Sequence, residues 1–122
     1  MPGVDERPPI WVGHVVLSVS DLDRATRFWT GIGMREVETN PHVSVLELRG
    51  GTHLVLVPGS SSGGEAPFDL MVDDLDATHE MWSDQGLYVS EITRGRIHDG
   101  FTVTDPDGYV VSISNSHVVG PV

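Results

Sequence analysis

The chain has 122 residues and a formal net charge of −11 at pH 7, so its length is that of one ordinary domain. This negative charge argues against a nucleic-acid-binding protein, which needs a basic surface. It is compatible with a cationic ligand, although such a charge more often reflects a solvated acidic surface. The chain has no cysteine and all seven basic residues are arginines, which excludes thiol chemistry, disulfides and lysine Schiff bases.

The sequence contains no apolar run of the roughly 18 residues that a membrane span requires. Its first residues also lack the basic-then-apolar order of a signal peptide. We therefore expect a cytoplasmic protein that binds neither membrane nor nucleic acid. The chemistry that remains open is acid–base or metal chemistry through His, Asp and Glu, or binding without catalysis.

The first half of the chain predicts one helix among several strands. Residues 1–9 predict a loose arm, and Ile10–Val19 is rich in β-branched residues and predicts a strand. Ser20 is the expected N-cap of a helix that ends at Gly31 and Gly33. Three strands should follow, over 34–39, 43–49 and 52–57, with Gly50-Gly51 as the hairpin between the last two.

The second half repeats this order after a Gly/Ser-rich segment, 58–67, whose composition predicts a flexible linker. Asp105-Pro-Asp-Gly108 predicts a tight turn, because proline presets φ at its second position and glycine closes it. The expected elements are a strand over 68–72, a helix over 74–85 and strands over 87–93, 100–104 and 109–114.

An internal repeat explains why the two halves agree. Leu17, Asp21-Leu22-Asp23, Trp29 and Gly33 recur 53 residues later as Leu70, Asp74-Leu75-Asp76, Trp82 and Gly86. Such self-similarity indicates two copies of one structural unit. We therefore predict two βαβββ modules, over 10–57 and 68–117, within a single domain, 1–122. The two repeated tryptophans, Trp29 and Trp82, should lie in the core.

The paired modules, the start motif His14-x-x-Leu-x-Val-x-Asp-Leu and the end motif Asp105-Pro-Asp-Gly-Tyr resemble the vicinal oxygen chelate superfamily. This superfamily includes glyoxalase I, bleomycin resistance proteins, fosfomycin resistance enzymes and extradiol dioxygenases. The resemblance spans nearly all of 10–117 and implies an α+β fold, in which two tandem βαβββ modules form a curved mixed sheet around a cleft.

The resemblance also implies four metal-ligand positions, which correspond here to His14, Val55, Pro67 and Ser112. An enzymatic divalent metal needs about three protein ligands and an open position. Valine and proline side chains cannot coordinate, and a neutral serine hydroxyl coordinates poorly. The sequence therefore predicts that the superfamily's metal site is degenerate and that no metal cofactor is bound, although a divalent metal stays possible through other residues.

Strand alternation offers one replacement site. His14, His53 and Glu47 have the parity of one sheet face, and two histidines with one carboxylate suit non-haem iron. The simpler interpretation is that His53 and Glu47 are ordinary polar residues at strand ends. Asp69 would lie among apolar residues of the cleft, where it could act as a base or contact a cationic ligand.

Two functions of different class follow. The first is a small-molecule binding protein like the metal-free bleomycin resistance proteins, a homodimer that holds a small organic ligand, which can be cationic, in the cleft. The second is a metal-dependent lyase, isomerase or dioxygenase in which His14, His53 and Glu47 bind the metal. The sequence identifies no catalytic residue. The expected ligand-binding residues are Trp11, His14, Val16, Glu47, His53, Val55, Asp69, Met71 and Ser112.

Overall fold

The first module places one helix against a four-stranded mixed sheet. In the computed structural model, which describes residues 4–122, its elements are β1 (His14–Val19), α1 (Leu22–Gly31), β2 (Arg35–Asn40), β3 (Val43–Glu47), the short 3-10 turn η1 (Arg49–Gly51) and β4 (His53–Pro58). The strand order is β1-β4-β3-β2, with β1 parallel to β4 and the other pairs antiparallel. One edge of β1 is therefore left without a neighbouring strand in this sheet.

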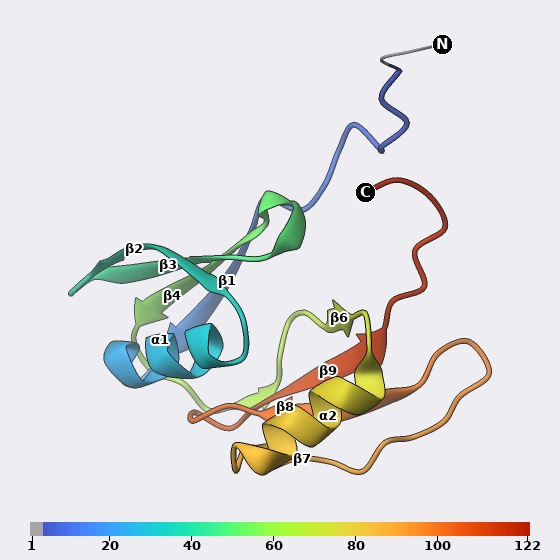
Figure 1. Cartoon of the computed structure of the whole chain (residues 1–122). Coiled ribbons are helices and arrows are strands. Elements are labelled where there is room, and N and C mark those ends of the chain that lie inside the picture. The colour runs from blue at the N-terminus through green and yellow to red at the C-terminus, as the bar shows by residue number, and fades with distance from the viewer. Residues whose placement is uncertain (1–3) are drawn as a thin grey trace.

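The second module repeats this plan with shorter strands. Its elements are β5 (Gly64–Glu65), β6 (Leu70–Val72), α2 (Leu75–Asp84), β7 (Tyr88–Val89), β8 (Gly100–Thr104) and β9 (Tyr109–Asn115). The order is β5-β9-β8-β7, and β6 also pairs with β9, so β5 and β6 together occupy the position that β1 has in the first module. Figure 1 shows the two modules, each with its helix on one side of its sheet.

The predicted fold class is confirmed, since residues 4–122 combine two α-helices with mixed sheets in an α+β arrangement. The strands form two separate open sheets and not one continuous curved sheet. Segment 58–67, predicted as a flexible linker, contains β5 and the buried Ala66, whose N–H donates to the carbonyl of Val110 over 2.9 Å. The linker is thus partly built into the second sheet.

Several predicted boundaries differ from the structure. Asp21, and not Ser20, caps α1 by accepting a hydrogen bond from the Arg24 N–H, and Asp74 caps α2 in the same way. The predicted strand over 10–19 begins only at His14, and the one over 87–93 is reduced to Tyr88–Val89 with an isolated bridge at Thr93. Residues 4–13 form no helix or strand, whereas 1–3 of the predicted arm lie outside the described residues.

The core lies between each helix and its sheet because alternate strand residues point to one face. Leu17, Val19, Leu54 and Leu56 bury this face in the first module, as Val103, Val111 and Ile113 do in the second. Trp29 is fully buried and Trp82 nearly so, which confirms the prediction that both are core residues. In each sheet, the face that points away from the helix is not covered by a helix of residues 4–122, and we call it the open face.

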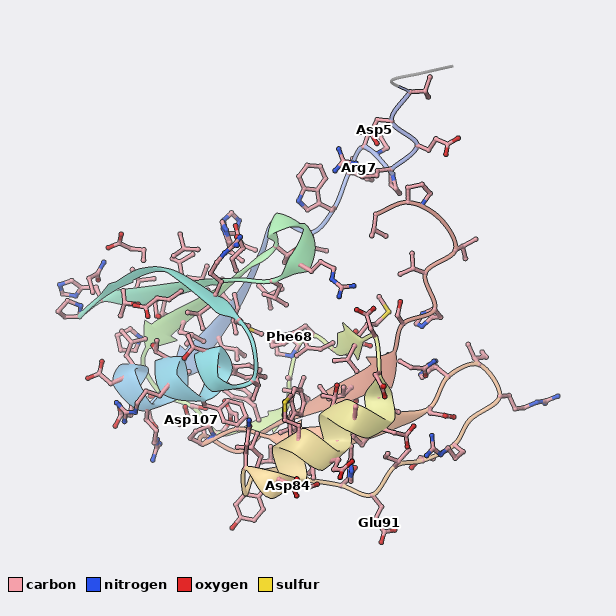
Figure 2. All side chains as sticks on the ribbon, viewed as in Figure 1. Asp5, Arg7, Phe68, Asp84, Glu91 and Asp107 are labelled. Carbon is pink, nitrogen blue, oxygen red and sulfur yellow. The ribbon has the colours of Figure 1, made fainter. Side chains whose placement is uncertain are left out.

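Contacts from the β8–β9 turn join the two modules. The buried Asp107 carboxylate accepts hydrogen bonds from the N–H (3.1 Å) and hydroxyl of Ser20, just before α1, and the Tyr109 hydroxyl donates to the carbonyl of Ser18. The Phe68 ring packs 5.9 Å from the ring of Trp29. Figure 2 shows Asp107 beside α1 and Phe68 between the modules.

Both terminal segments extend away from the two modules (Figure 1). Within residues 4–122, neither helix is long and apolar enough to cross a membrane.

Candidate functional site

The open face of the first sheet carries most of the predicted site residues. Strand pairing sets Val16 beside Val55 and His14 beside His53, and β3 contributes Glu47 opposite His53. All five side chains therefore share one face, as strand parity predicts. Val16 is 55% exposed although it is an apolar residue in the middle of a strand, so this face presents a valine surface that residues 4–122 leave uncovered.

A polar corner borders this valine surface. The His53 Nε2–H donates to Glu47 Oε1 over 3.0 Å, and Arg35 on β2 pairs with Glu47 Oε2. The His14 and His53 ring centroids lie 5.6 Å apart with tilted planes. The Arg35 guanidinium, followed by His53, lowers the pKa of Glu47 by donating hydrogen bonds to its carboxylate.

This corner does not fit a metal ion. Both Glu47 oxygens already accept hydrogen bonds, and the nitrogen of His53 nearest to them is used by that carboxylate. Across the described residues 4–122, no three His, Cys, Asp or Glu side chains are grouped so that they could hold a metal ion. The structure thus brings His14, His53 and Glu47 together, with a hydrogen bond between His53 and Glu47 and the His14 ring beside that of His53, but not as a ligand set.

The open face of the second sheet contains a cavity of about 380 Å³. It is bounded by Asp69 and Phe68 from the segment before β6, by Glu65 on β5, and by Val110 and Ser112 on β9. Met71, at the same parity as Asp69, is half exposed next to this region. The cavity combines an aromatic ring and apolar carbons with two carboxylates, a composition that suits an organic ligand bearing a positive charge.

A second cavity, of about 220 Å³, shares Asp69 and Ser112 with the first. Its wall is rich in hydroxyl groups, because Thr102 on β8 lies directly across from Ser112 on β9. Its further lining residues are Ser90, Thr93, His98, Gly100, Phe101, Ile113 and Ser114. Asp69 therefore stands at the junction between a partly apolar cavity and a hydroxyl-lined one.

The predicted residues are consequently divided between two faces. His14, Val16, Glu47, His53 and Val55 lie on the first sheet, whereas Asp69, Met71 and Ser112 lie on the second, and neither cavity described above has a lining residue from the first sheet. Trp11 is 69% exposed on the N-terminal segment and lines neither cavity. The four positions expected for metal ligands are divided in the same way, since Pro67 and Ser112 line the larger cavity.

Sequence reasoning did not assign Ser90, Thr102 and Ser114 to the site. These residues line the same cavity from β8, from β9 and from the position after β7. Alternation along β9 could have identified Ser114, because it has the parity of Ser112. The contribution of Ser90 depends on pairing between distant segments, where its hydroxyl accepts a hydrogen bond from the Thr102 N–H over 2.8 Å.

Comparison with known proteins gives one family match. The family described as Glyoxalase/Bleomycin resistance protein/Dioxygenase superfamily matches residues 11–113. None of the curated proteins matches the sequence at a significant level.

Solved structures of similar fold include proteins of different activity. Lactoylglutathione lyase from Agrobacterium tumefaciens has a TM-score of 0.76 at 20% identity, covering 90% of this chain and 96% of its own. TnmS3, an antibiotic binding protein from Streptomyces sp. CB03234, has a TM-score of 0.77 at 23% identity, covering 89% of this chain and 98% of its own. These likenesses describe the fold, because the same fold serves both catalysis and binding.

Proposed function

Because the chain belongs to the glyoxalase/bleomycin resistance protein/dioxygenase superfamily, we propose that it is a small-molecule binding protein of this superfamily with a degenerate metal site. The ligand is a small organic molecule, and a cationic one suits the site. It occupies the open face of the second sheet, where Asp69 and Ser112 border both cavities. Binding requires no metal ion and no catalytic residue is assigned.

The observation that carries this proposal is the chemistry of the positions where metal-using members place their ligands. Val55 and Pro67 offer no coordinating side-chain atom, and His14 and Ser112 belong to different sheets. A lone histidine does not retain a divalent metal, which needs about three protein ligands. The cavity beside Pro67 and Ser112 is instead available to an organic ligand.

The antibiotic binding function of TnmS3 supports this assignment by showing what a protein of this fold can do without a stated reaction. The lactoylglutathione lyase of similar fold favours the alternative, a metal-dependent lyase, isomerase or dioxygenase. That alternative would need His14 to bind a metal with His53 and Glu47. Within residues 4–122 these three side chains are not grouped as a ligand set, and Glu47 is already paired with Arg35 and His53.

The proposal includes a homodimer. Large apolar side chains on both open faces support it, since Val16 is 55% exposed and Met71 50% exposed. A second copy could cover these faces and complete a cleft by bringing the first sheet of one subunit opposite the second sheet of the other. The exposed Trp11 next to β1 would then be available to contact a ligand or the partner subunit.

A combined metal and ligand measurement tests the proposed function. Elemental analysis of the purified protein, before and after incubation with Fe(II), Zn(II), Ni(II) or Mn(II), should find no stoichiometric metal. Screening of small organic compounds by thermal melting should identify ligands that stabilise the metal-free protein, because binding to the native state raises the melting temperature. Ser112→Trp, which fills the cavity, should remove this stabilisation.

The matched control is Met81→Trp, which adds the same side chain to the exposed side of α2, outside both cavities. It should leave the ligand-induced shift unchanged. Stoichiometric metal that disappears in His14→Ala would contradict the proposal and support the enzyme alternative. A stabilising compound that is unaffected by Ser112→Trp would contradict the assigned location.

A further inference from the structure

The two cavities of the second sheet differ in chemistry and meet at one carboxylate. The larger one offers the Phe68 ring and the Val110 side chain together with Glu65, which pairs with Val110 across β5 and β9. The smaller one offers hydroxyl groups on neighbouring strands. Asp69 lines both. A single ligand that fills both cavities must therefore place a group of positive charge or strong hydrogen-bond donors at this junction.

Asp69 is free to bind such a group. Five of the seven arginines pair with carboxylates in the described residues, and Asp69 is not among their partners, which are Asp5, Glu47, Asp73, Asp76, Asp99 and Asp107. Neither cavity has an arginine in its wall. A carboxylate that has no cation within the protein and faces a cavity is a ready partner for an ammonium group.

The hydroxyl-lined cavity gives an independent indication of the ligand. Ser114 is only 8% exposed and lines this cavity. A hydroxyl side chain at a cavity wall is available to hydrogen-bond with what fills the cavity. Thr102 and Ser112, which face each other across β8 and β9, add two more hydroxyls nearby.

Hydroxyl side chains both donate and accept hydrogen bonds, and this is also the property of ligand hydroxyl groups. We propose that the two cavities form one site for a hydroxylated ammonium compound, of which an amino sugar is the simplest example. Asp69 binds the ammonium group, and Thr102, Ser112 and Ser114 bind ligand hydroxyls. The inference rests on the proposed small-molecule function and specifies the ligand class of that same site.

Three probes of similar size separate the charge from the hydroxyl groups. Glucosamine carries both, N-acetylglucosamine keeps the hydroxyls without the charge, and cyclohexylamine keeps the charge without the hydroxyls. Titrations of the full chain followed by amide NMR should show glucosamine shifting the resonances of Asp69, Thr102 and Ser112. Both other probes should bind at least about tenfold more weakly, since a charge-assisted hydrogen bond is worth more than one factor of ten.

Two substitutions assign the parts of the ligand to residues. Asp69→Asn should weaken glucosamine about tenfold and leave N-acetylglucosamine unchanged, whereas Ser114→Ala should weaken both sugars and leave cyclohexylamine unchanged. Asp84→Asn removes the same charge at the exposed end of α2 and should alter none of the affinities. Amide spectra of each free variant establish that it is folded before titration.

The outcomes distinguish this inference from the proposed function. Equal affinity for glucosamine and N-acetylglucosamine, or full affinity in Asp69→Asn, would overturn the inference. A neutral apolar compound that shifts the cavity resonances while glucosamine does not would also overturn it, but would leave the small-molecule function intact. If neither glucosamine nor any compound of the melting screen bound, both proposals would be overturned.

Discussion

Asp105 and Glu47 are two carboxyl groups in opposite electrostatic environments. Asp105 is 5% exposed, and although its Oδ1 accepts hydrogen bonds from the N–H groups of Asp107 and Tyr109, its buried Oδ2 has no partner in residues 4–122. Burial raises the pKa of Asp105 because the charged form is poorly solvated. Hydrogen bonds from Arg35, and then from His53, lower the pKa of Glu47.

These shifts give opposite contributions to stability. The raised pKa of Asp105 means that the native state binds this proton more tightly than the unfolded state does, so its contribution is present at low pH and is lost as pH rises through the folded pKa. The lowered pKa of Glu47 gives a contribution that is present above the unfolded pKa and is lost as pH falls through the folded pKa.

Carboxyl ¹³C NMR titration should therefore find Asp105 above the ordinary aspartate pKa of about 3.9 and Glu47 below the ordinary glutamate pKa of about 4.3. Arg35→Gln should return the pKa of Glu47 toward its ordinary value, because Arg35 is the largest cause of the shift. The same substitution should leave Asp105 unchanged, which provides the control. An unshifted Glu47 in the wild-type protein would contradict the observed Arg35 contact.

The β8–β9 turn is the element that connects the modules most directly. Asp105 shapes the turn from within, and Asp107 projects from it to the start of α1, where it accepts hydrogen bonds from Ser20. The corresponding turn of the first module, η1, spans Arg49–Gly51 and carries no carboxylate. Arg49 in that turn instead pairs with Asp73 of the second module. The junction is thus buried on one side and solvent-exposed on the other.

Asp107→Ala should reduce the free energy of unfolding by about 1–3 kcal/mol, because it removes the charged acceptor of two hydrogen bonds, from the N–H and the hydroxyl of Ser20. Asp73→Ala also removes a carboxylate that links the modules, but its side chain is 68% exposed. Since an exposed ion pair contributes about 0–1 kcal/mol, this second variant should lose little stability. Urea unfolding measures both, and equal losses would refute the distinction between the two contacts.

At the scale of the whole molecule, one side of each sheet is buried and the other is open. The core between each helix and its sheet is buried within one chain. Val16, Met71 and Val110, in contrast, remain exposed on the open faces of the sheets. Exposed apolar residues that join into a patch mark interaction or ligand sites in soluble proteins. The proposed homodimer and the proposed ligand would cover these two faces.

Sedimentation at micromolar concentration should detect a dimer of the wild-type chain. Val16→Asp should shift the equilibrium toward monomer, because a charge would be placed on the apolar open face of the first sheet. Met81→Asp is the matched control, since Met81 is about as exposed as Val16 but lies on α2. A monomeric wild-type protein would refute the homodimer, and equal dissociation of both variants would refute the assigned interface.

Local sequence patterns were enough to predict the order of elements, the faces of the strands and the buried tryptophans. The repeat predicted two βαβββ modules, and strand alternation predicted which side chains of β1, β3 and β4 share the open face. The burial of Trp29 and Trp82 followed from helical spacing. These features could be predicted because each depends on the period of one helix or strand, which neighbouring residues fix together.

Only the tertiary structure decided which distant residues meet. It divided the predicted site between two sheets, inserted β5 into the expected linker, and brought Ser90, Thr102 and Ser114 to one cavity. It also placed Asp107 against Ser20, 87 residues away in sequence. Such contacts depend on the register between strands and on the packing of one module against the other, and no local period of the sequence encodes either.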